Sequence, residues 1–174
     1  MDAIDSYWSV IDVLPKTGVA ELLSHGYGVD QPDQLGKTLL SLACQYLRTD
    51  DAKLLIARGA NLNLRSADGN TPLLCVIDVS NHNLDAAYEI ANALAEAGAD
   101  IEMRGYMDKT PFLKACSRGC LEILQLLVTK GCDIHATTDD ASSEGPTTSG
   151  LDLARIFGGS SEFMDYVRGL YQRS

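Results

Sequence analysis

The most constraining feature of this sequence is a pattern that returns at a nearly constant interval along the chain. Its first landmark is a threonine that opens an apolar segment, at Thr38, Thr71 and Thr110. Its second landmark is a glycine that follows an apolar run, at Gly59, Gly98 and Gly131. The interval is 33 positions from Thr38 to Thr71 and from Gly98 to Gly131, but 39 from Thr71 to Thr110. A period near 33 residues indicates small helical units stacked along one axis.

The residues around these landmarks predict a pair of helices in each unit. A threonine side chain can accept a hydrogen bond from a free backbone N–H at a helix start. Pro72 and Pro111 then occupy the first helical position, where a missing N–H costs nothing. A glycine after the second helix can end it in a left-handed conformation. Because so small a pair cannot bury its own apolar face, we expect the pairs to stack into an elongated slab.

The two landmarks together resemble the ankyrin repeat. The openings read Gly-Lys-Thr-Leu-Leu from 36, Gly-Asn-Thr-Pro-Leu from 69 and Asp-Lys-Thr-Pro-Phe from 108, and a typical closing is Arg-Gly-Ala-Asn-Leu-Asn from 58. The histidine that usually follows Thr-Pro-Leu is replaced by Ser41, Leu74 and Leu113. The resemblance implies an all-α solenoid of helix-turn-helix units joined by finger hairpins or loops. It also implies that the chain binds another protein.

The register divides the chain, as a single domain over 1–174, into about three internal repeats and two caps. We expect an N-terminal cap at 1–32, repeats at 33–65, 66–104 and 105–137, and a long finger loop with a C-terminal cap at 138–174. The first cap helix is expected at 4–14, with Trp8 in the core. The repeat at 66–104 carries six extra residues, which we place in the turn at 79–84.

Composition excludes several classes of function. The chain has 174 residues, is 45% apolar and carries a formal net charge of −10, so a phosphate backbone is an unfavourable target. The charge favours either plain solubility or attraction to a basic partner. No apolar stretch is long enough to span a membrane, and the acidic start at 1–12 does not resemble a secretory signal. We therefore expect a cytoplasmic protein with neither a nucleic-acid nor a membrane partner.

The reactive side chains do not converge in the sequence. Five cysteines are scattered and mostly lie in apolar runs, which is typical of reduced core residues: Cys44, Cys75, Cys116, Cys120 and Cys132. Cys116 and Cys120 have no further ligands at zinc spacing. We expect no metal, no cofactor and no catalytic residue. An enzyme with a site in the 138–148 loop is a remote alternative, because that loop contains no His, Cys or Lys.

The resemblance also implies where a partner would bind, on the finger tips and on the exposed side of each first helix. By register, the fingers contribute Gln34, Leu35, Lys37, Ala67, Asp68, Asn70, Tyr106, Met107 and Lys109. The first helices contribute Gln45, Tyr46, Asp78, Ser117 and Arg118. The long last finger adds Asp139, Asp140 and Glu144. The most informative members are Tyr46, Tyr106, Met107 and Arg118, because Tyr, Met and Arg are enriched at interface centres, although Tyr46 could instead pack on the adjacent helix.

Two functions fit these expectations. The first is a non-enzymatic protein that masks or inhibits one partner, most concretely an immunity protein that neutralises a cognate toxin with a basic surface. The second is an adaptor or regulator that docks other partners. A toxin gene immediately beside this one would favour the first, and an isolated gene would favour the second. Nothing in the residues fixes the oligomeric state, and we favour a monomer.

Overall fold

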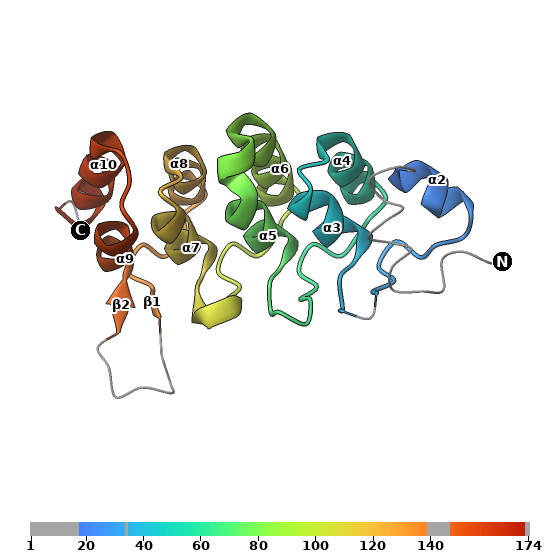
Figure 1. Cartoon of the computed structure of the whole chain (residues 1–174), viewed down its shortest axis with the longest axis horizontal. Coiled ribbons are helices and arrows are strands. Elements are labelled where there is room, and N and C mark those ends of the chain that lie inside the picture. Colours follow the sequence, from blue (N-terminus) through green and yellow to red (C-terminus); the bar gives the residue numbers. More distant parts are fainter. Residues whose placement is uncertain (1–17, 34, 139–146, 173–174) are drawn as a thin grey trace.

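Short helices stacked in pairs make up most of the structure. The computed structural model describes residues 18–33, 35–138 and 147–172. The elements in order are α2 (Val19–Ser24), α3 (Leu39–Gln45), α4 (Thr49–Ala57), α5 (Pro72–Val79), η1 (Ser80–His82), α6 (Leu84–Glu96), η2 (Tyr106–Asp108), α7 (Pro111–Arg118), α8 (Leu121–Thr129), β1 (Thr137–Thr138), β2 (Thr148–Ser149), α9 (Gly150–Phe157) and α10 (Ser161–Gln172). Figure 1 shows the pairs side by side in one row, with loops projecting from one edge.

The first helices and the second helices form two layers. Helices α3, α5, α7 and α9 pack on one another in sequence, and we call their exposed side, with the loops, the first-helix face. Helices α2, α4, α6 and α8 likewise pack in sequence, and we call their outer side the second-helix face. The main contacts between described helices therefore join adjacent units, as the expected stacked architecture requires.

The threonines cap the first helices as expected. The hydroxyl oxygens of Thr38, Thr71 and Thr110 accept hydrogen bonds from the backbone N–H three residues on, at 3.2, 3.4 and 3.3 Å. Ser149 does the same for α9, where the Asp152 carboxylate completes a capping box by accepting from the Ser149 backbone N–H. Each cap satisfies a donor that would otherwise be unpaired at the helix start.

The glycines that close each unit have left-handed backbone conformations. Gly59, Gly98 and Gly131 have φ values of 77°, 90° and 85°. A Cβ at any of the three would meet no atom within 4 Å. Glycine is therefore favoured here by its backbone freedom alone, and the space around it would accept a side chain.

The core lies between the pairs. Leu39, Leu73, Leu74 and Phe112 are among the largest side chains that are fully buried, and they belong to successive first helices. Burying each such side chain stabilises the fold by about 1.5–3 kcal/mol relative to leaving it exposed. Since these residues contact the neighbouring unit, each pair depends on the next for its apolar burial.

Polar bonds also fix the register between units. The backbone N–H of Asn61 donates to the Asp30 carboxylate at 2.8 Å, and that of Asp100 donates to the Asn63 side-chain oxygen at 2.9 Å. The same arrangement recurs where Asp133 N–H donates to Glu102 at 2.7 Å. The polar residue that ends each closing sequence thus holds the backbone of the following unit.

The six extra residues of the middle unit are divided between a turn and a helix. We expected them in the turn at 79–84, and η1 does lie there. However, α6 has 13 residues whereas α4 and α8 have 9 each, so four residues form an additional turn of α6. The side chain of Asn83 caps this extended start by accepting from Ala86 N–H at 3.2 Å. The insertion therefore lengthens the second-helix face.

The ends of the chain are described in part. Helix α2 occupies the closing half of the N-terminal unit, as expected, whereas the predicted helix at 4–14 and Trp8 lie outside the described residues. Helices α9 and α10 form the final pair, and α10 buries Phe163 and Val167. The last finger begins as an antiparallel β1–β2 pair, in which Thr137 pairs with Ser149.

Candidate functional site

The finger at 104–109 is held in a strained conformation. Met107 and Asp108 have φ values of 58° and 54°, a region that costs on the order of 1–3 kcal/mol for residues other than glycine. Arg104 stabilises this shape, because its Nη1 donates to the Asp108 carbonyl at 2.8 Å and to the Asp108 carboxylate at 2.7 Å. The same atom donates to the Thr137 carbonyl at 2.8 Å. One guanidinium thus fixes this finger and attaches it to the next.

The strained finger presents two large side chains to solvent. Tyr106 is 60% exposed and Met107 is 63% exposed. They line a pocket of about 210 Å³ together with Phe157, at the end of α9, which is 59% exposed. The other lining residues are Lys109, Lys114, Ser117 and Arg118. This aromatic pocket lies between the third internal unit and the final pair.

Three cations surround the aromatic pocket. Lys109 is buried, and its Nζ lies 5.2 Å from the centroid of the Phe157 ring. Burial, and then the charges of Lys114 and Arg118, lower the pKa of Lys109. A cation over an aromatic face is attracted by the ring quadrupole, so Phe157 partly offsets the cost of burying Lys109.

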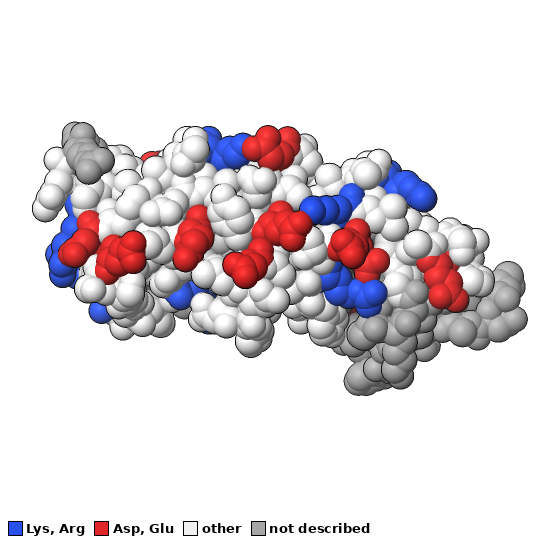
Figure 2. All heavy atoms as spheres, turned by 90° about the horizontal axis from the view of Figure 1, so that it is seen from above, with Lys and Arg blue, Asp and Glu red and all other residues white. Residues whose placement is uncertain are grey.

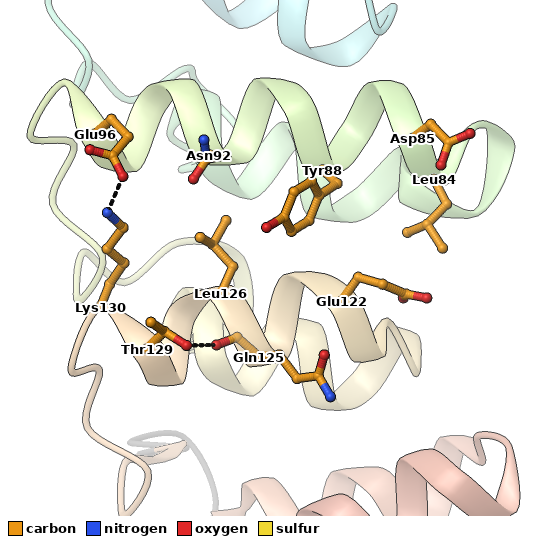
Figure 3. Close-up of a pocket in the computed structure, with 10 residues that line it drawn as sticks. All are labelled: Leu84, Asp85, Tyr88, Asn92, Glu96, Glu122, Gln125, Leu126, Thr129 and Lys130. Atoms are coloured by element: carbon orange, nitrogen blue, oxygen red, sulfur yellow. Dashed lines mark hydrogen bonds and ion pairs between the residues drawn. The ribbon is translucent and has the colours of Figure 1, made fainter.

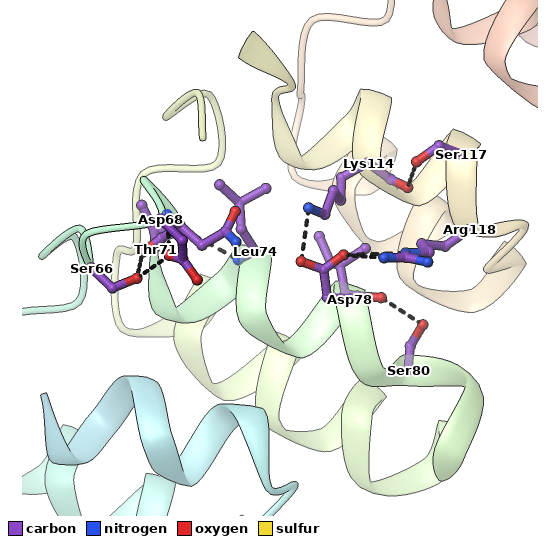
Figure 4. A network of polar contacts seen from close by, with 11 residues as sticks. Ser66, Asp68, Thr71, Leu74, Asp78, Ser80, Lys114, Ser117 and Arg118 are labelled. Carbon is purple, nitrogen blue, oxygen red and sulfur yellow. Dashed lines mark hydrogen bonds and ion pairs between the residues drawn. The ribbon is translucent and has the colours of Figure 1, made fainter. Parts of the chain in front are cut away.

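One carboxylate on α5 forms ion pairs with two of these cations. Figure 4 shows Asp78 pointing toward Lys114 and Arg118 on α7. Its oxygens lie 2.8 Å from Lys114 Nζ and 2.6 Å from Arg118 Nη2. Lys114 is almost fully buried in this pair, whereas the Arg118 side chain is 45% exposed. Arg118 therefore keeps donors available to a ligand while Asp78 holds its position.

The remaining predicted contact residues lie apart from the aromatic pocket. Lys37 Nζ donates to Gln45 Oε1 at 2.7 Å, which joins one finger to the end of α3. Asp68 accepts from Ser66 and Asn70 within its own finger, and these bonds lower the pKa of Asp68 although partial burial alone would raise it. Leu35 and Tyr46 are exposed, and the Leu35 carbonyl accepts from the backbone N–H of Ala67 at 2.7 Å.

Some predicted contact residues are placed differently. Asn70 and Lys109 are mostly buried rather than displayed on finger tips, and of the two Lys109 still lines the aromatic pocket. Asn70 is covered by the next finger, where Gly105 approaches so closely that a Cβ there would lie 2.3 Å from Leu74 Cδ1. Gln34, Asp139, Asp140 and Glu144 lie outside the described residues.

Sequence reasoning missed Phe157 and Lys114. Phe157 follows Leu153 and Ala154 at helical spacing, which is typical of a core position, but α9 ends there and leaves the ring beyond the core. Lys114 lies between apolar residues of α7 and is the one charged residue that this helix buries. A lysine inside an otherwise apolar helix was the available signal for a buried charge with a partner.

A second hollow lies on the second-helix face. It is a groove of about 780 Å³ between α6 and α8, where α6 packs less closely than it does on α4. Figure 3 shows Tyr88 and Leu126 directed into it from opposite helices, with Leu84 at one end. Leu84 lies in the additional turn of α6, so the insertion supplies one end of the groove.

Acidic side chains dominate the surface around this groove. Asp85, Glu96 and Glu122 line it, and only Glu96 has an ion-pair partner there among the described residues, Lys130. Figure 2 shows acidic groups spaced along the side of the molecule opposite the fingers. Asp50, Asp85 and Glu122 each lie in the first turn of a second helix, where a negative charge stabilises the helix dipole.

The cysteine thiols are in surroundings that disfavour nucleophilic chemistry. All five cysteines are free and buried. Burial raises the pKa of Cys75 and of Cys132 to about 12, so the nucleophilic thiolate is disfavoured at neutral pH. Within the residues that the structure describes, no three His, Cys, Asp or Glu side chains gather at a geometry that could hold a metal ion.

Comparison with known families identifies the repeat. The family model described as ankyrin repeats (3 copies) matches residues 15–105. The chain belongs to the ankyrin-repeat family. A second model, ankyrin repeat, matches residues 108–136, so the two together span the described helix pairs up to α8. The resemblance drawn from the threonine and glycine landmarks is thereby confirmed.

Curated relatives share the ankyrin repeats over part of their length. The chain is 29% identical to neurogenic locus notch homolog protein 1 of Mus musculus over 110 residues, 63% of this chain and 4% of that protein. It is 28% identical to ankyrin repeat protein OPG189 of Variola virus over 124 residues, 66% of this chain and 21% of that protein. It is 30% identical to protein fem-1 homolog A of Danio rerio over 89 residues, 47% of this chain and 14% of that protein.

These matches indicate the class of activity. Ankyrin repeats form a protein–protein interaction module of a family that is generally non-enzymatic, and this chain carries such a module. The chain spans a small fraction of the length of the relatives above. Among the described residues, no helix combines the length and the apolar character that a membrane crossing requires.

Proposed function

We propose that this ankyrin-repeat chain binds a partner protein through the first-helix face and masks it. The observation that carries the proposal is the aromatic pocket, where Tyr106, Met107 and Phe157 are each about 60% exposed around a set of cations. Large exposed apolar side chains beside an Arg are typical of the centre of a protein interface. Because Arg104 fixes the finger beforehand, little conformational entropy is lost when a partner binds.

The most concrete form of this proposal is an immunity protein that neutralises a toxin. A stacked array offers a broad, rigid surface, which suits occlusion of a partner's active surface rather than catalysis. The net charge of −10 would draw in a toxin with a basic surface from a distance. Expression of this chain together with the product of a neighbouring toxin gene should restore growth. Unchanged toxicity would refute the immunity function, but it would not refute the binding of another partner protein.

Substitution of the pocket tests the proposal directly. Replacement of Tyr106 and Phe157 by alanine should weaken partner binding by at least about 2 kcal/mol, or roughly 30-fold in Kd. Calorimetry with a partner purified from the native source measures this change. Tyr88→Ala is the matched control, since Tyr88 is 42% exposed on the opposite face. Equal affinity in all three proteins would refute binding through the pocket.

A second candidate function, an adaptor that docks two partners, is favoured by the α6–α8 groove. The groove lies on the second-helix face and is acidic, whereas the aromatic pocket lies on the first-helix face and is cationic. Two surfaces of opposite charge on opposite layers suit two different partners. An adaptor should form a ternary complex from which Tyr88→Ala removes one partner and Tyr106→Ala removes the other. Loss of the same single partner in both variants would exclude the adaptor function.

A further inference from the structure

No ion pair joins the ammonium group of Lys109 to any carboxylate among the described residues. The residue is only 8% exposed, and among the described residues no carboxylate or other hydrogen-bond acceptor contacts its Nζ. Within the part of the chain that the structure describes, Nζ lies 5.2 Å from the centroid of the Phe157 ring. A buried charge is normally paired, because an unpaired one retains the full cost of its lost hydration. The fully buried side-chain atoms without a partner among the described residues do not include Lys109 Nζ, so this nitrogen reaches the open aromatic pocket that it lines and can meet an anion there.

Within the described residues, the neighbouring carboxylates are already engaged by other cations. Asp78 is already engaged by Lys114 and Arg118, so three cations share one carboxylate. Asp108, the next acid along the finger, is held by Arg104 on the other side of the turn. The described part of the pocket is consequently positive, although the chain as a whole is strongly negative. This local reversal of sign is what distinguishes the pocket from the rest of the surface.

We propose that the aromatic pocket receives a Glu or Asp side chain of the partner, with an adjacent apolar side chain placed against Tyr106, Met107 and Phe157. The carboxylate would accept hydrogen bonds from Lys109 and from the exposed donors of Arg118. Burial strengthens such charge-assisted bonds, and Phe157 shields them from water. The inference rests on the proposed function and names the chemistry that the partner must present.

A side-chain carboxylate fits better than a chain terminus. The first-helix layer continues from the pocket to α5 and α3, and Leu35 and Tyr46 at the α3 unit are exposed, as is Ile156 on α9 itself. A partner segment that runs across the face can contact all of these residues while its acidic side chain enters the pocket. A segment that ended in the pocket would leave one side of the face uncovered.

Small blocked peptides test this chemistry without the partner. The full chain would be labelled with ¹³C-methyl methionine, which reports on Met107 at the pocket and on Met164 of α10 as an internal reference. Acetyl-Glu-Phe-amide should shift the Met107 signal saturably and leave the Met164 signal unchanged. Acetyl-Gln-Phe-amide should bind at least about tenfold more weakly, because it lacks the charge.

The remaining arms separate the alternatives. Tighter binding of acetyl-Gln-Phe with a free terminal carboxylate would overturn the choice of a side chain. An equal response to inorganic phosphate would assign the pocket to phosphate chemistry instead. Equal shifts from the Glu and Gln peptides, or none from either, would overturn the carboxylate site itself. Binding of a protein partner that still depends on Tyr106 would then leave the proposed function standing.

Paired variants show which cation is responsible. Lys109→Gln should weaken the binding of acetyl-Glu-Phe-amide by about tenfold or more. Lys53→Gln makes the same charge change at an exposed residue of α4 outside the pocket and should have no effect. If Lys109→Gln does not fold by circular dichroism, Arg118→Gln replaces it, since the Arg118 side chain is 45% exposed. If Lys53→Gln weakens peptide binding equally, the effect comes from the net charge of the protein and not from the pocket, and the proposal is overturned.

Discussion

At the scale of single residues, two glycines with opposite surroundings predict opposite effects of the same substitution. A Cβ on Gly150 would lie 2.5 Å from Phe112 Cε1 and 3.0 Å from Cys116 Sγ, whereas a Cβ on Gly169 would meet nothing within 4 Å. Gly150→Ala should therefore destabilise the protein by about 1–3 kcal/mol. Gly169→Ala, in the interior of α10, should stabilise it by about 0.5–1 kcal/mol. Urea denaturation of both variants checks the pair, and the same sign in both would contradict the packing of α9 on α7.

The buried thiols predict a loss of stability in alkali. Desolvation raises the pKa of Cys75 and of Cys132 to about 12, whereas thiols in the unfolded chain titrate near 9. Between these values the unfolded chain has released protons that the folded chain retains, so rising pH favours unfolding. Stability should be insensitive to these thiols below about pH 8 and should fall above about pH 9. Urea midpoints measured across this range test the sign, with a Cys75→Ala, Cys132→Ala double variant expected to flatten the decline.

Individual residues also show where reading the sequence succeeds and where it fails. The threonine caps and the left-handed glycines were predictable, because each depends on its own local backbone. The exposure of Leu35 and Met107 followed from their place on fingers. The burial of Asn70 and Lys109 did not, because it depends on a neighbouring finger and on a ring at the end of another helix. Such contacts lie between repeats, beyond what the pattern within one repeat reports.

At the scale of elements, the additional turn of α6 predicts that the insertion can be removed. Deletion of 80–85 with Ala86→Gly restores the 33-residue spacing and leaves the buried positions Ile90 and Leu94 in register with Gly98. The shortened chain should fold cooperatively and lose about 1–2 kcal/mol, mainly the Asn83 cap. Circular dichroism and urea denaturation measure both properties. A chain that no longer folds would show that the insertion is part of the core.

The same element shows why the sequence located the insertion but not its form. The 39-residue interval counts six extra residues without saying whether they are turn or helix. Asn83 was the usable signal, since Asn is a preferred helix cap and here it caps the start of α6. The α6–α8 groove could not be predicted, because it depends on how far two helices diverge in space.

At the scale of the whole molecule, charge predicts how a partner is captured. If the partner is basic, the net charge of −10 should accelerate association, and salt should slow it because the Debye length shortens. Raising the salt from about 0.05 to 0.5 M should lower the association rate by about tenfold or more and change dissociation far less. Stopped-flow mixing separates the two rates. An association rate independent of salt would show that the acidic charge serves solubility alone.

The architecture as a whole was the most predictable property, because one repeat explains the caps, the glycines and the stack together. Long-range attraction and local recognition then act at different stages, with the overall charge drawing a partner in and the aromatic pocket selecting one side chain. These two roles reside in different layers of the same stack, since acidic groups line the groove between the second helices and the cations of the aromatic pocket lie by the first helices.

That separation gives the described part of the protein an electric dipole moment between the fingers and the side opposite them. In the field of a charged partner such a molecule experiences a torque as well as a pull, so it rotates while it approaches. A partner that is basic over its whole surface would turn the second helices toward itself and would first meet the α6–α8 groove, so a basic toxin that binds the aromatic pocket must also carry a local acidic loop. A partner bearing a local acidic loop would turn the fingers toward itself. The charge map of a partner would thus decide which side of the array it reaches first.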